Sequence, residues 1–376
     1  MLKTMFPTID RESSMLGFGC MRFPTTPEGK IDEAEAIRMI RHAIDSGVTY
    51  IDTAYPYHGG ESEVVVGKAL QDGYREKVIL TTKLPCWNVK TYEDMMRLLD
   101  EQLAKLQTDH VDFYILHAMN KDRLKQMQEL DYKKFYAEAM AQGKVRYPGF
   151  SFHDDAETFI RILDDWDQWK MAQVQMNILD DENQATLAGI REAGKRGVGV
   201  VIMEPLRGGM LANPPADVAA VYDAFADKRS PVEWAFRYLY AMPEVITILS
   251  GMSNWEQVTD NLRIFDIEAR PELTEAEEAL FRSAKATYMA RTKTRCTGCR
   301  YCQPCPMGVQ IPRIFQGYDG AMLYAEADFS KGYARIVADE ADASRCVQCR
   351  QCESNCPQHL PIVEFLQEIH EASAAK

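Results

Sequence analysis

Four titratable residues in the first third of the chain, Asp52, Tyr57, Lys83 and His117, have side chains with complementary chemistry. Hydride reduction of a carbonyl needs a proton donor for the developing alkoxide, and a tyrosine can serve although its free pKa is about 10. A lysine ammonium beside the phenol lowers that pKa, and a carboxylate behind the lysine keeps it charged and oriented. A histidine across the pocket can hydrogen-bond the substrate oxygen. These residue types therefore predict proton transfer at a reacting oxygen, provided that the fold gathers them.

The elements that must position these residues alternate between two periodicities. Short apolar runs rich in β-branched and aromatic residues are typical of strands covered on both faces. Helical segments separate them: those beginning at Asp32 and Thr274 have the spacing of a capping box, and Thr91 is expected to begin a further helix in a similar way. About eight such pairs predict an α/β protein with a (β/α)₈ TIM barrel. A doubly wound sheet is the alternative, but no Gly-x-Gly-x-x-Gly turn follows the first strand. The expected strands are Met15–Met21, Thr49–Tyr55, Val78–Leu84, Val111–Ala118, Val145–His153, Met171–Ile178, Gly197–Leu206 and Val245–Met252.

The carboxyl ends of the strands are where such barrels carry their chemistry. Asp52, Lys83 and His117 stand at the ends of the second, third and fourth expected strands, and Tyr57 follows the second. Taken singly, each residue has a structural interpretation: an ion pair for Asp52 and Lys83, a core histidine, and a packed tyrosine. Because all four stand at corresponding ends of consecutive strands, we expect them to share one site.

The motifs around these residues resemble the aldo-keto reductase family over about residues 15–265. The resemblance implies a barrel that binds NAD(P)H without a Rossmann domain. It also implies that Tyr57 is the general acid, Lys83 lowers its pKa, Asp52 orients Lys83, and His117 positions the substrate. Trp87 stands where the family often lines its substrate pocket with an aromatic ring. The motifs are Gly-Phe-Gly-Cys-Met-Arg at 17–22, Asp-Thr-Ala-x-x-Tyr at 52–57, Thr-Lys at 82–83, and His117.

The same resemblance implies a set of cofactor-binding positions, some of which depart from the family pattern. Phe152 replaces the usual asparagine after Ser151, and Met203 stands where a tyrosine usually stacks on the nicotinamide. Gly251 and Gln257 occupy positions that often carry Lys or Arg for a 2′-phosphate, and their lack of charge favours NADH over NADPH. These departures also admit a flavin as an additional cofactor. The implied positions are Ser151, Gln173, Met203, Pro205, Leu206, Gly251, Ser253, Gln257 and Asn261.

The cysteines are concentrated at the end of the chain, where eight of the ten fall after residue 295. This density is typical of disulfide or metal scaffolds, and a cytosolic chain favours the metal. Two runs are present, Cys-x₂-Cys-x₂-Cys-x₂-Cys-Pro at 296–306 and Cys-x₂-Cys-x₂-Cys-x₃-Cys-Pro at 346–357. The second matches the bacterial ferredoxin run, and the first is one residue shorter before its last cysteine.

These runs resemble a two-cluster ferredoxin domain, in which the fourth cysteine of each run serves the other cluster. The resemblance implies two [4Fe–4S] clusters in sites that we call A and B. The alternative is zinc, because paired Cys-x₂-Cys motifs also bind structural zinc. Three overlapping Cys-x₂-Cys steps followed by Cys-Pro, present twice, favour the clusters. Site A consists of Cys296, Cys299, Cys302 and Cys356, and site B of Cys346, Cys349, Cys352 and Cys305.

Length and charge set the wider expectations. Residues 1–290 are expected to form the barrel, and residues 291–376 a small, mainly helical ferredoxin-like domain. In that domain, short helices are expected at Tyr318–Ala327 and Tyr333–Val337, between the two cysteine runs. Acidic residues outnumber basic ones 56 to 43, and a net charge of −13 repels nucleic acid and anionic membranes. The longest stretch without Asp, Glu, Lys or Arg is Tyr301–Pro312, which is too short to span a bilayer, and the N-terminus lacks a signal-peptide core. We therefore expect a soluble cytoplasmic protein.

Two functions from different classes fit these features. The first is an oxidoreductase that reduces a small carbonyl compound, or oxidises an alcohol, with NAD(P)H and carries two [4Fe–4S] clusters for electron transfer or structure. The second is an electron-transfer or redox-sensing protein that uses the barrel as a scaffold and works with a redox partner protein. Nicotinamide passes two electrons and a cluster passes one, so direct exchange normally needs a mediator such as a flavin. The intact Asp52, Tyr57, Lys83 and His117 favour the enzyme.

Overall fold

The computed structural model describes residues 1–296, 298, 300, 302–324, 329–356 and 359–374. The chain divides into two compact units, Met1–Gly208 with Val232–Leu273, and Gly209–Pro231 with Thr274–Lys376. In this division the helix α11 (Glu275–Ala290) belongs to the second unit. The domain boundary expected after residue 290 stays a prediction.

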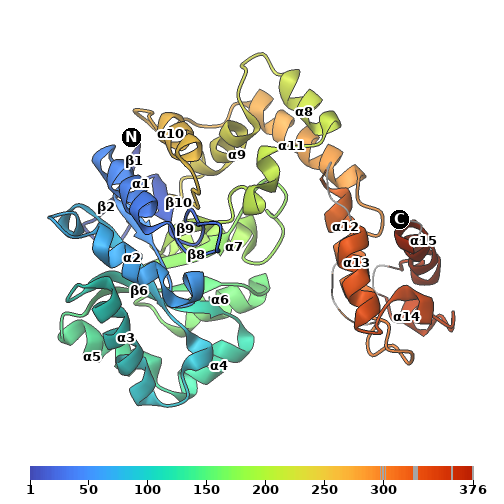
Figure 1. Ribbon diagram of the computed structural model, residues 1–376, viewed down its shortest axis with the longest axis horizontal. Helices are drawn as coiled ribbons and strands as arrows, with labels where there is room; N and C mark the ends of the chain where they lie inside the picture. Colours follow the sequence, from blue (N-terminus) through green and yellow to red (C-terminus); the bar gives the residue numbers. More distant parts are fainter. Residues whose placement is uncertain (297, 299, 301, 325–328, 357–358, 375–376) are drawn as a thin grey trace. The chain divides into compact units, whose positions relative to one another are not determined.

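The first unit is a closed barrel of eight parallel strands, which confirms the predicted fold (Figure 1). Its strand order is β10-β3-β4-β5-β6-β7-β8-β9, so that each strand pairs with its neighbours in sequence and the last pairs with the first. Seven of the eight expected apolar runs each contain one strand, and the strand in the remaining run, Val111–Ala118, extends one residue further, to Met119. The strands are β3 (Leu16–Gly19), β4 (Tyr50–Asp52), β5 (Ile79–Leu84), β6 (Val111–Met119), β7 (Val145–Phe152), β8 (Met171–Gln175), β9 (Gly199–Met203) and β10 (Val245–Ser250).

Side chains that point into the barrel alternate along each strand, as a period of two requires. A buried apolar cluster that includes Tyr50, Phe113 and Ile115 fills the interior of the barrel. Phe6 joins this cluster from the turn between β1 (Lys3–Met5) and β2 (Glu12–Ser14), and its ring centroid lies 5.0 Å from that of Phe113. This N-terminal hairpin was not expected from the sequence. It closes the end of the barrel opposite the polar strand ends.

Helices surround the strands and bury one apolar face each (Figure 1). The predicted helix starts at Asp32 and Thr91 are present: the Asp32 carboxylate accepts from the Glu35 N–H, and Thr91 forms a capping box with Asp94. No described helix is long and apolar enough to cross a membrane. The helices of this unit are α1 (Glu33–Asp45), α2 (Ser62–Ala69), α3 (Tyr92–Leu106), α4 (Lys121–Glu129), α5 (Tyr132–Ala141), α6 (Ala156–Asp165), α7 (Thr186–Lys195), α9 (Pro231–Tyr240) and α10 (Trp255–Ile264), with short 3₁₀ turns η1 (Tyr57–Gly60), η2 (Arg75–Lys77) and η3 (Cys86–Asn88). The 3₁₀ turn η4 (Arg207–Ala212) begins in this unit and ends in the second.

The second unit is helical, as predicted for the cysteine-rich region. The helix α11 begins with the predicted capping box between Thr274 and Glu277 and packs on α8 (Ala216–Asp223). The spacer between the cysteine runs forms α12 (Ile311–Met322) and α13 (Phe329–Ala338). The first begins earlier than the helix expected from Tyr318, because Pro312 stands in its first turn, where proline favours helix initiation. The end expected for that helix, 325–327, lies outside the described residues. The remaining elements are η5 (Ala343–Arg345), α14 (Gln351–Ser354) and α15 (Ile362–Ala374).

Candidate active site

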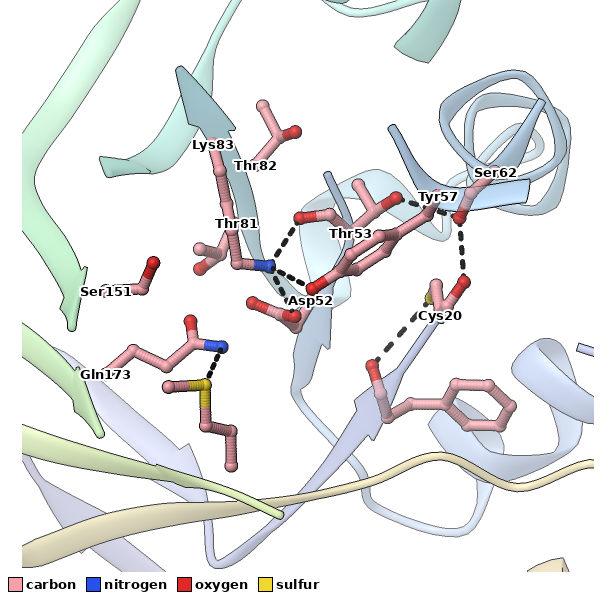
Figure 2. A network of polar contacts seen from close by, with 12 residues as sticks. Cys20, Asp52, Thr53, Tyr57, Ser62, Thr81, Thr82, Lys83, Ser151 and Gln173 are labelled. Carbon is pink, nitrogen blue, oxygen red and sulfur yellow. Dashed lines mark hydrogen bonds and ion pairs between the residues drawn. The ribbon is translucent and has the colours of Figure 1, made fainter. Parts of the chain in front are cut away.

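Three of the four residues singled out from the sequence form one hydrogen-bonded group at the barrel mouth (Figure 2). The Lys83 ammonium donates to Asp52 Oδ1 at 2.7 Å, to the Thr53 carbonyl at 2.8 Å and to the Tyr57 hydroxyl at 3.2 Å. Lys83 thereby uses all three of its N–H bonds. Asp52 and Lys83 are 2% and 1% exposed, respectively, so water does not screen their ion pair. The lysine is thus fixed against the phenol.

The ionisation of this group follows from its burial and its charges. Burial alone would lower the pKa of Lys83, but Asp52 and Tyr57 outweigh it and the pKa lies above its ordinary value. Burial raises the pKa of the Tyr57 phenol, and the Lys83 ammonium opposes that rise. Lys83 acts in the expected direction, yet burial has the larger effect. Tyr57 therefore holds its proton at neutral pH.

A second layer of buried polar residues supports these side chains, and the sequence analysis did not single it out. The Glu63 carboxylate on α2 accepts from the Thr82 hydroxyl at 2.6 Å and from the Gln102 amide at 2.5 Å. The same Gln102 amide donates to the Lys83 carbonyl at 3.0 Å, and the Tyr114 hydroxyl donates to Gln102 Oε1 at 2.7 Å. The backbone that carries Lys83 is thus tied to α2, α3 and β6. The sequence did contain one signal for this layer: Glu63 is a charged residue at the second position of α2, directly before three valines.

His117 owes its position to a bulge in β6. Leu116 pairs with Phe150 and Met119 with Phe152, so His117 and Ala118 together stand opposite Ser151. Ala118 has a φ of 55°, and its N–H donates to Ser151 Oγ at 2.7 Å. The His117 ring lies at the mouth, with its centroid 6.2 Å from that of Tyr57. The structure therefore brings all four residues to one place.

The imidazole of His117 is electrically neutral in this setting. Burial, together with the positive charges of Lys83 and Arg123 and the nearby His153, lowers the pKa of His117 to about 2. Its Nδ1 atom is buried and has no hydrogen-bond partner among the described residues. Because Nδ1 is buried, the other ring nitrogen, Nε2, is the one that can face a substrate. In a neutral ring an N–H on Nε2 can donate to a substrate oxygen without supplying charge.

This shift predicts a pH dependence of stability. Unfolded chains protonate histidine near its ordinary pKa of about 6.5, whereas folded His117 protonates near 2. Between these values the unfolded state binds more protons, so the contribution of His117 is present above about pH 6.5 and is lost as the pH falls. We expect His117→Gln to show a shallower decline in Tm between about pH 7 and pH 4 than the unmodified protein. Superimposable Tm profiles measured by differential scanning fluorimetry would contradict this expectation.

The side chains expected to hold a nicotinamide carboxamide lie on the opposite wall. Ser151 and Gln173 lie near each other and are 1% and 2% exposed (Figure 2). Met203 Sδ lies 4.0 Å from Gln173 Nε2. Gln173 Oε1 is buried without a partner among the described residues. Ser151 Oγ already accepts from Ala118 and retains its own proton for donation. One free acceptor and one free donor match the NH₂ and C=O of a carboxamide, so these residues fit the group.

The remaining implied positions lie in the loops after β9 and β10. Pro205 is buried and Leu206 half-buried, directly after Met203. The Ser253 hydroxyl donates to the Arg22 carbonyl at 2.8 Å, and its N–H donates to Gln257 Oε1 at 2.7 Å. These interactions fix the loop itself. Two further positions have structural partners: Gly251 lies under the Arg22 side chain, and the Asn261 amide donates to Ser250 Oγ at 2.8 Å.

The cysteines of site B line one pocket in the second unit. Cys305, Cys346, Cys349 and Cys352 all line it, and so does Cys302, which is assigned to site A. Cys305 comes from the first run and the other three from the second, which is the crossed arrangement. Among the described residues, no group of three or more His, Cys, Asp and Glu side chains converges closely enough to hold a single metal ion. A pocket lined by four thiols from both runs fits a cluster.

Site A is described in part. Cys356 is buried beside the small apolar core of this unit, and Cys296 and Cys302 pack against the same core. Cys299 lies outside the described residues. Cys356 comes from the second run, and Cys296 and Cys302 come from the first. Cys305 and Cys356, the fourth cysteines of the two runs, both contact this apolar core.

An aspartate missed by the sequence analysis fixes the backbone that leads into site A. Asp319 on α12 is 8% exposed and accepts from the N–H groups of Lys293, Thr294 and Arg295 at 2.7 to 2.9 Å. It also accepts from the Thr294 hydroxyl at 2.7 Å, and that hydroxyl in turn accepts from the Cys296 N–H at 3.2 Å. Asp319 is therefore a positioning residue for Cys296.

We expect Asp319→Ala to lower the iron content of anaerobically purified protein below about eight per chain, with the loss confined to site A. Removing the carboxylate leaves three buried or half-buried N–H groups without an acceptor, so the segment before Cys296 no longer has one fixed conformation. Asp339→Ala is the matched control, because Asp339 is an exposed acid paired with Arg313. Iron content equal in all three proteins would show that Asp319 has no part in site A.

Comparison with known proteins agrees with this geometry. The aldo/keto reductase family matches residues 15–279, and a 4Fe-4S dicluster domain matches residues 295–360. The uncharacterized oxidoreductase YqkF of Bacillus subtilis is 26% identical over 296 residues, covering 70% of this chain and 90% of that protein. The L-galactose dehydrogenase of Arabidopsis thaliana is 28% identical over 271 residues, covering 66% and 83%. The holo form of aldo-keto reductase AKR11C1 from Bacillus halodurans superimposes with a TM-score of 0.64 at 26% identity, covering 76% of this chain and 96% of that one.

The closed barrel, the polar residues at its mouth and the family match together place this chain in a known class of oxidoreductases. The chain belongs to the aldo/keto reductase family, whose members are typically NAD(P)H-dependent and act on small carbonyl substrates. It carries in addition a 4Fe-4S dicluster domain, which implies two clusters.

Proposed function

We propose that this protein reduces a small carbonyl compound to an alcohol with NAD(P)H, or catalyses the reverse oxidation, at the barrel mouth. The observation that carries the proposal is the placement of the Lys83 ammonium between Asp52 Oδ1 and the Tyr57 hydroxyl, at 2.7 and 3.2 Å. A structural ion pair would account for Asp52 and Lys83 alone. It does not account for a protonated phenol held against them at a strand end.

The four residues divide the acid–base work. Tyr57 gives its proton to the substrate oxygen as negative charge develops there, and Lys83 stabilises the phenolate that results. Asp52 keeps Lys83 charged and in place. Neutral His117 hydrogen-bonds the same substrate oxygen and orients the carbonyl. In the oxidative direction each proton transfer runs backwards.

The nicotinamide cofactor, when bound, supplies or accepts the hydride. Ser151 and Gln173 would hold its carboxamide, and Met203 would stand where the family usually has a tyrosine against the nicotinamide. The segments from Met203 to Leu206 and from Gly251 to Asn261 would contact the rest of the dinucleotide. Gly251 and Gln257 carry no charge, and the nearby Arg22 guanidinium lies 3.9 Å from Glu204 Oε1. We therefore propose a preference for NADH over NADPH.

The two clusters, when bound, carry single electrons. Cys305 with Cys346, Cys349 and Cys352 hold one in site B, and Cys296, Cys299, Cys302 and Cys356 hold the other in site A. Because hydride transfer moves two electrons, we propose that turnover in the barrel proceeds without a change in cluster oxidation state. The clusters serve the fold of the second unit or exchange electrons with a redox partner protein.

An anaerobic titration of the holoprotein with NADH, NADPH and FMN tests this proposal. Dinucleotide binding should appear as quenching of tryptophan fluorescence, tighter for NADH, while the visible absorbance of the clusters stays constant during turnover of an added aldehyde. Binding of FMN with bleaching of the clusters upon NADH addition would replace the proposal with flavin-mediated electron transfer. Absence of dinucleotide binding would favour the electron-transfer or redox-sensing alternative.

A further inference from the structure

An arginine that the mechanism does not use borders the substrate side of the mouth. Arg123 on α4 has its guanidinium carbon 5.4 Å from the centroid of the Trp87 ring. The Trp87 ring in turn lies 5.0 Å from the His117 ring. One aromatic ring therefore links the guanidinium to the histidine that faces the substrate oxygen.

The segments that carry this arginine and tryptophan are fastened to each other. The Gln126 amide on α4 donates to the carbonyls of Cys86 and Val89, at 3.3 and 2.7 Å. Cys86 begins the η3 turn that carries Trp87, and Val89 directly follows that turn. The Asn120 side chain caps α4 by accepting from the Arg123 N–H at 2.8 Å. The arrangement of Arg123 over Trp87 is therefore built by the fold.

The charge of Arg123 is not matched by an acid. No Asp or Glu among the described residues forms an ion pair with it, whereas the neighbouring cation Lys125 pairs with Glu129 at 3.9 Å. Among the described residues, the Arg123 guanidinium contacts the Ala118 carbonyl, to which Nη1 donates, and the face of the Trp87 ring. One hydrogen bond leaves most of the five guanidinium N–H groups available. The positive charge reaches the mouth, because Arg123 is among the causes that lower the pKa values of both His117 and His153.

We propose that Arg123 binds an anionic group of the substrate, so that this reductase acts on carbonyl compounds carrying a carboxylate or phosphate a short distance from the carbonyl. The proposal rests on the proposed function and specifies its substrate class. With the carbonyl oxygen between Tyr57 and His117, the next group along the substrate passes the Trp87 face and meets the guanidinium. A planar fork of N–H donors in a half-buried, uncompensated position suits an oxyanion.

The competing interpretation is structural: Arg123 closes the turn after β6 by hydrogen-bonding the Ala118 carbonyl. A structural role affects all substrates equally, because it acts through the position of His117. An anion-binding role affects charged substrates alone. The two are separated by pairs of substrates that differ in one charged group.

The kinetic test compares succinic semialdehyde with butanal, and glyceraldehyde 3-phosphate with glyceraldehyde, as substrates of the holoenzyme. We expect Arg123→Gln to raise KM for the preferred anionic aldehyde about tenfold or more, the scale of one lost charge-assisted hydrogen bond. The neutral aldehydes should be unaffected, and Arg123→Lys should recover part of the loss. Lys125→Gln, a cation removed from the same helix, is the matched control. The comparison of succinic semialdehyde with glyceraldehyde 3-phosphate shows whether the site prefers a carboxylate or a phosphate.

A binding measurement keeps the proposal testable apart from turnover. Succinate and inorganic phosphate are titrated into the holoprotein while tryptophan fluorescence is recorded. We expect the anion to change the tryptophan fluorescence of the unmodified protein and of Lys125→Gln. We expect no such change in Arg123→Gln or in Trp87→Phe.

Distinct results overturn the two proposals. Anion binding that depends on Arg123, without turnover of any aldehyde, would sink the proposed function and leave the anion site in place. Equal losses in Arg123→Gln for charged and neutral aldehydes, or an anion response that survives this substitution, would overturn the anion site.

Discussion

Tyr57→Phe is expected to lower kcat for carbonyl reduction by at least ~10²-fold, the scale of losing a positioned general acid. The phenol is the one described group with a dissociable proton that also hydrogen-bonds Lys83, at 3.2 Å. Removing its hydroxyl leaves the ring in place, since Phe retains the packing against His117. Dinucleotide affinity should hardly change, because Ser151 and Gln173 are untouched. Steady-state kinetics and fluorescence titration of the same preparation measure both quantities.

Tyr55→Phe provides the matched control for this substitution. Tyr55 precedes Tyr57 by two residues, and its ring lies 4.1 Å from the Lys105 ammonium, away from Lys83. Its loss of a hydroxyl should leave kcat within about twofold, the scale of an ordinary surface change. Near-normal turnover by Tyr57→Phe would remove this tyrosine from the mechanism.

Cys305→Ala is expected to remove the site B cluster and leave that of site A, although Cys305 belongs to the first run. The physical reason is the pocket that Cys305 shares with Cys346, Cys349 and Cys352. Cys356→Ala should do the opposite and impair site A. Anaerobic protein should hold about eight irons per chain, and each variant about four. Iron analysis combined with EPR of the reduced protein distinguishes the two clusters.

The control for these cysteine variants is Cys86→Ala, because Cys86 is buried in the barrel and stands outside both runs. Its iron content should equal that of the unmodified protein. Loss of the site A signal in Cys305→Ala would show that each run serves its own cluster. Stoichiometric zinc with little iron, after anaerobic purification, would contradict the cluster assignment altogether.

The barrel could be predicted because its signal is local. Each strand is an apolar run bounded by polar turns, and capping residues such as Thr91 and Thr274 bond within their own first turn. The N-terminal hairpin could not be predicted in this way. Its strands have three residues each, and Phe6 is buried only because the barrel end is there to receive it.

The candidate site likewise contains some residues that local sequence predicts and others that depend on contacts between distant segments. Asp52 and Lys83 follow from strand periodicity, since each stands two residues beyond an inward-facing neighbour at a strand end. His117 requires the bulge at Ala118, which depends on a hydrogen bond to Ser151 in another strand. Arg123 was missed because its relation to the mouth passes through Trp87, a residue from a different loop. Contacts between distant segments leave no periodic trace in the sequence.

The dicluster unit shows a further limit of sequence reasoning. The cysteine spacing indicates two clusters without any structural information. The role of Asp319 does not follow from spacing, because the residue acts from the middle of α12 on the backbone of 293–295. The grouping of Gly209–Pro231 with the second unit is equally hidden, since it depends on the packing of α8 against α11.

Transfer of deuterium is the most direct measurement of the central claim, which is that the barrel mouth passes hydride between nicotinamide and a carbonyl carbon. The holoprotein is incubated anaerobically with succinic semialdehyde or butanal and with NADH or NADPH carrying deuterium at C4, and the products are analysed by mass spectrometry. We expect an alcohol with one deuterium on the former carbonyl carbon, formed at least ~10²-fold more slowly by Tyr57→Phe. Oxidation of the dinucleotide with no deuterium in any product, accompanied by reduction of the clusters, would contradict it.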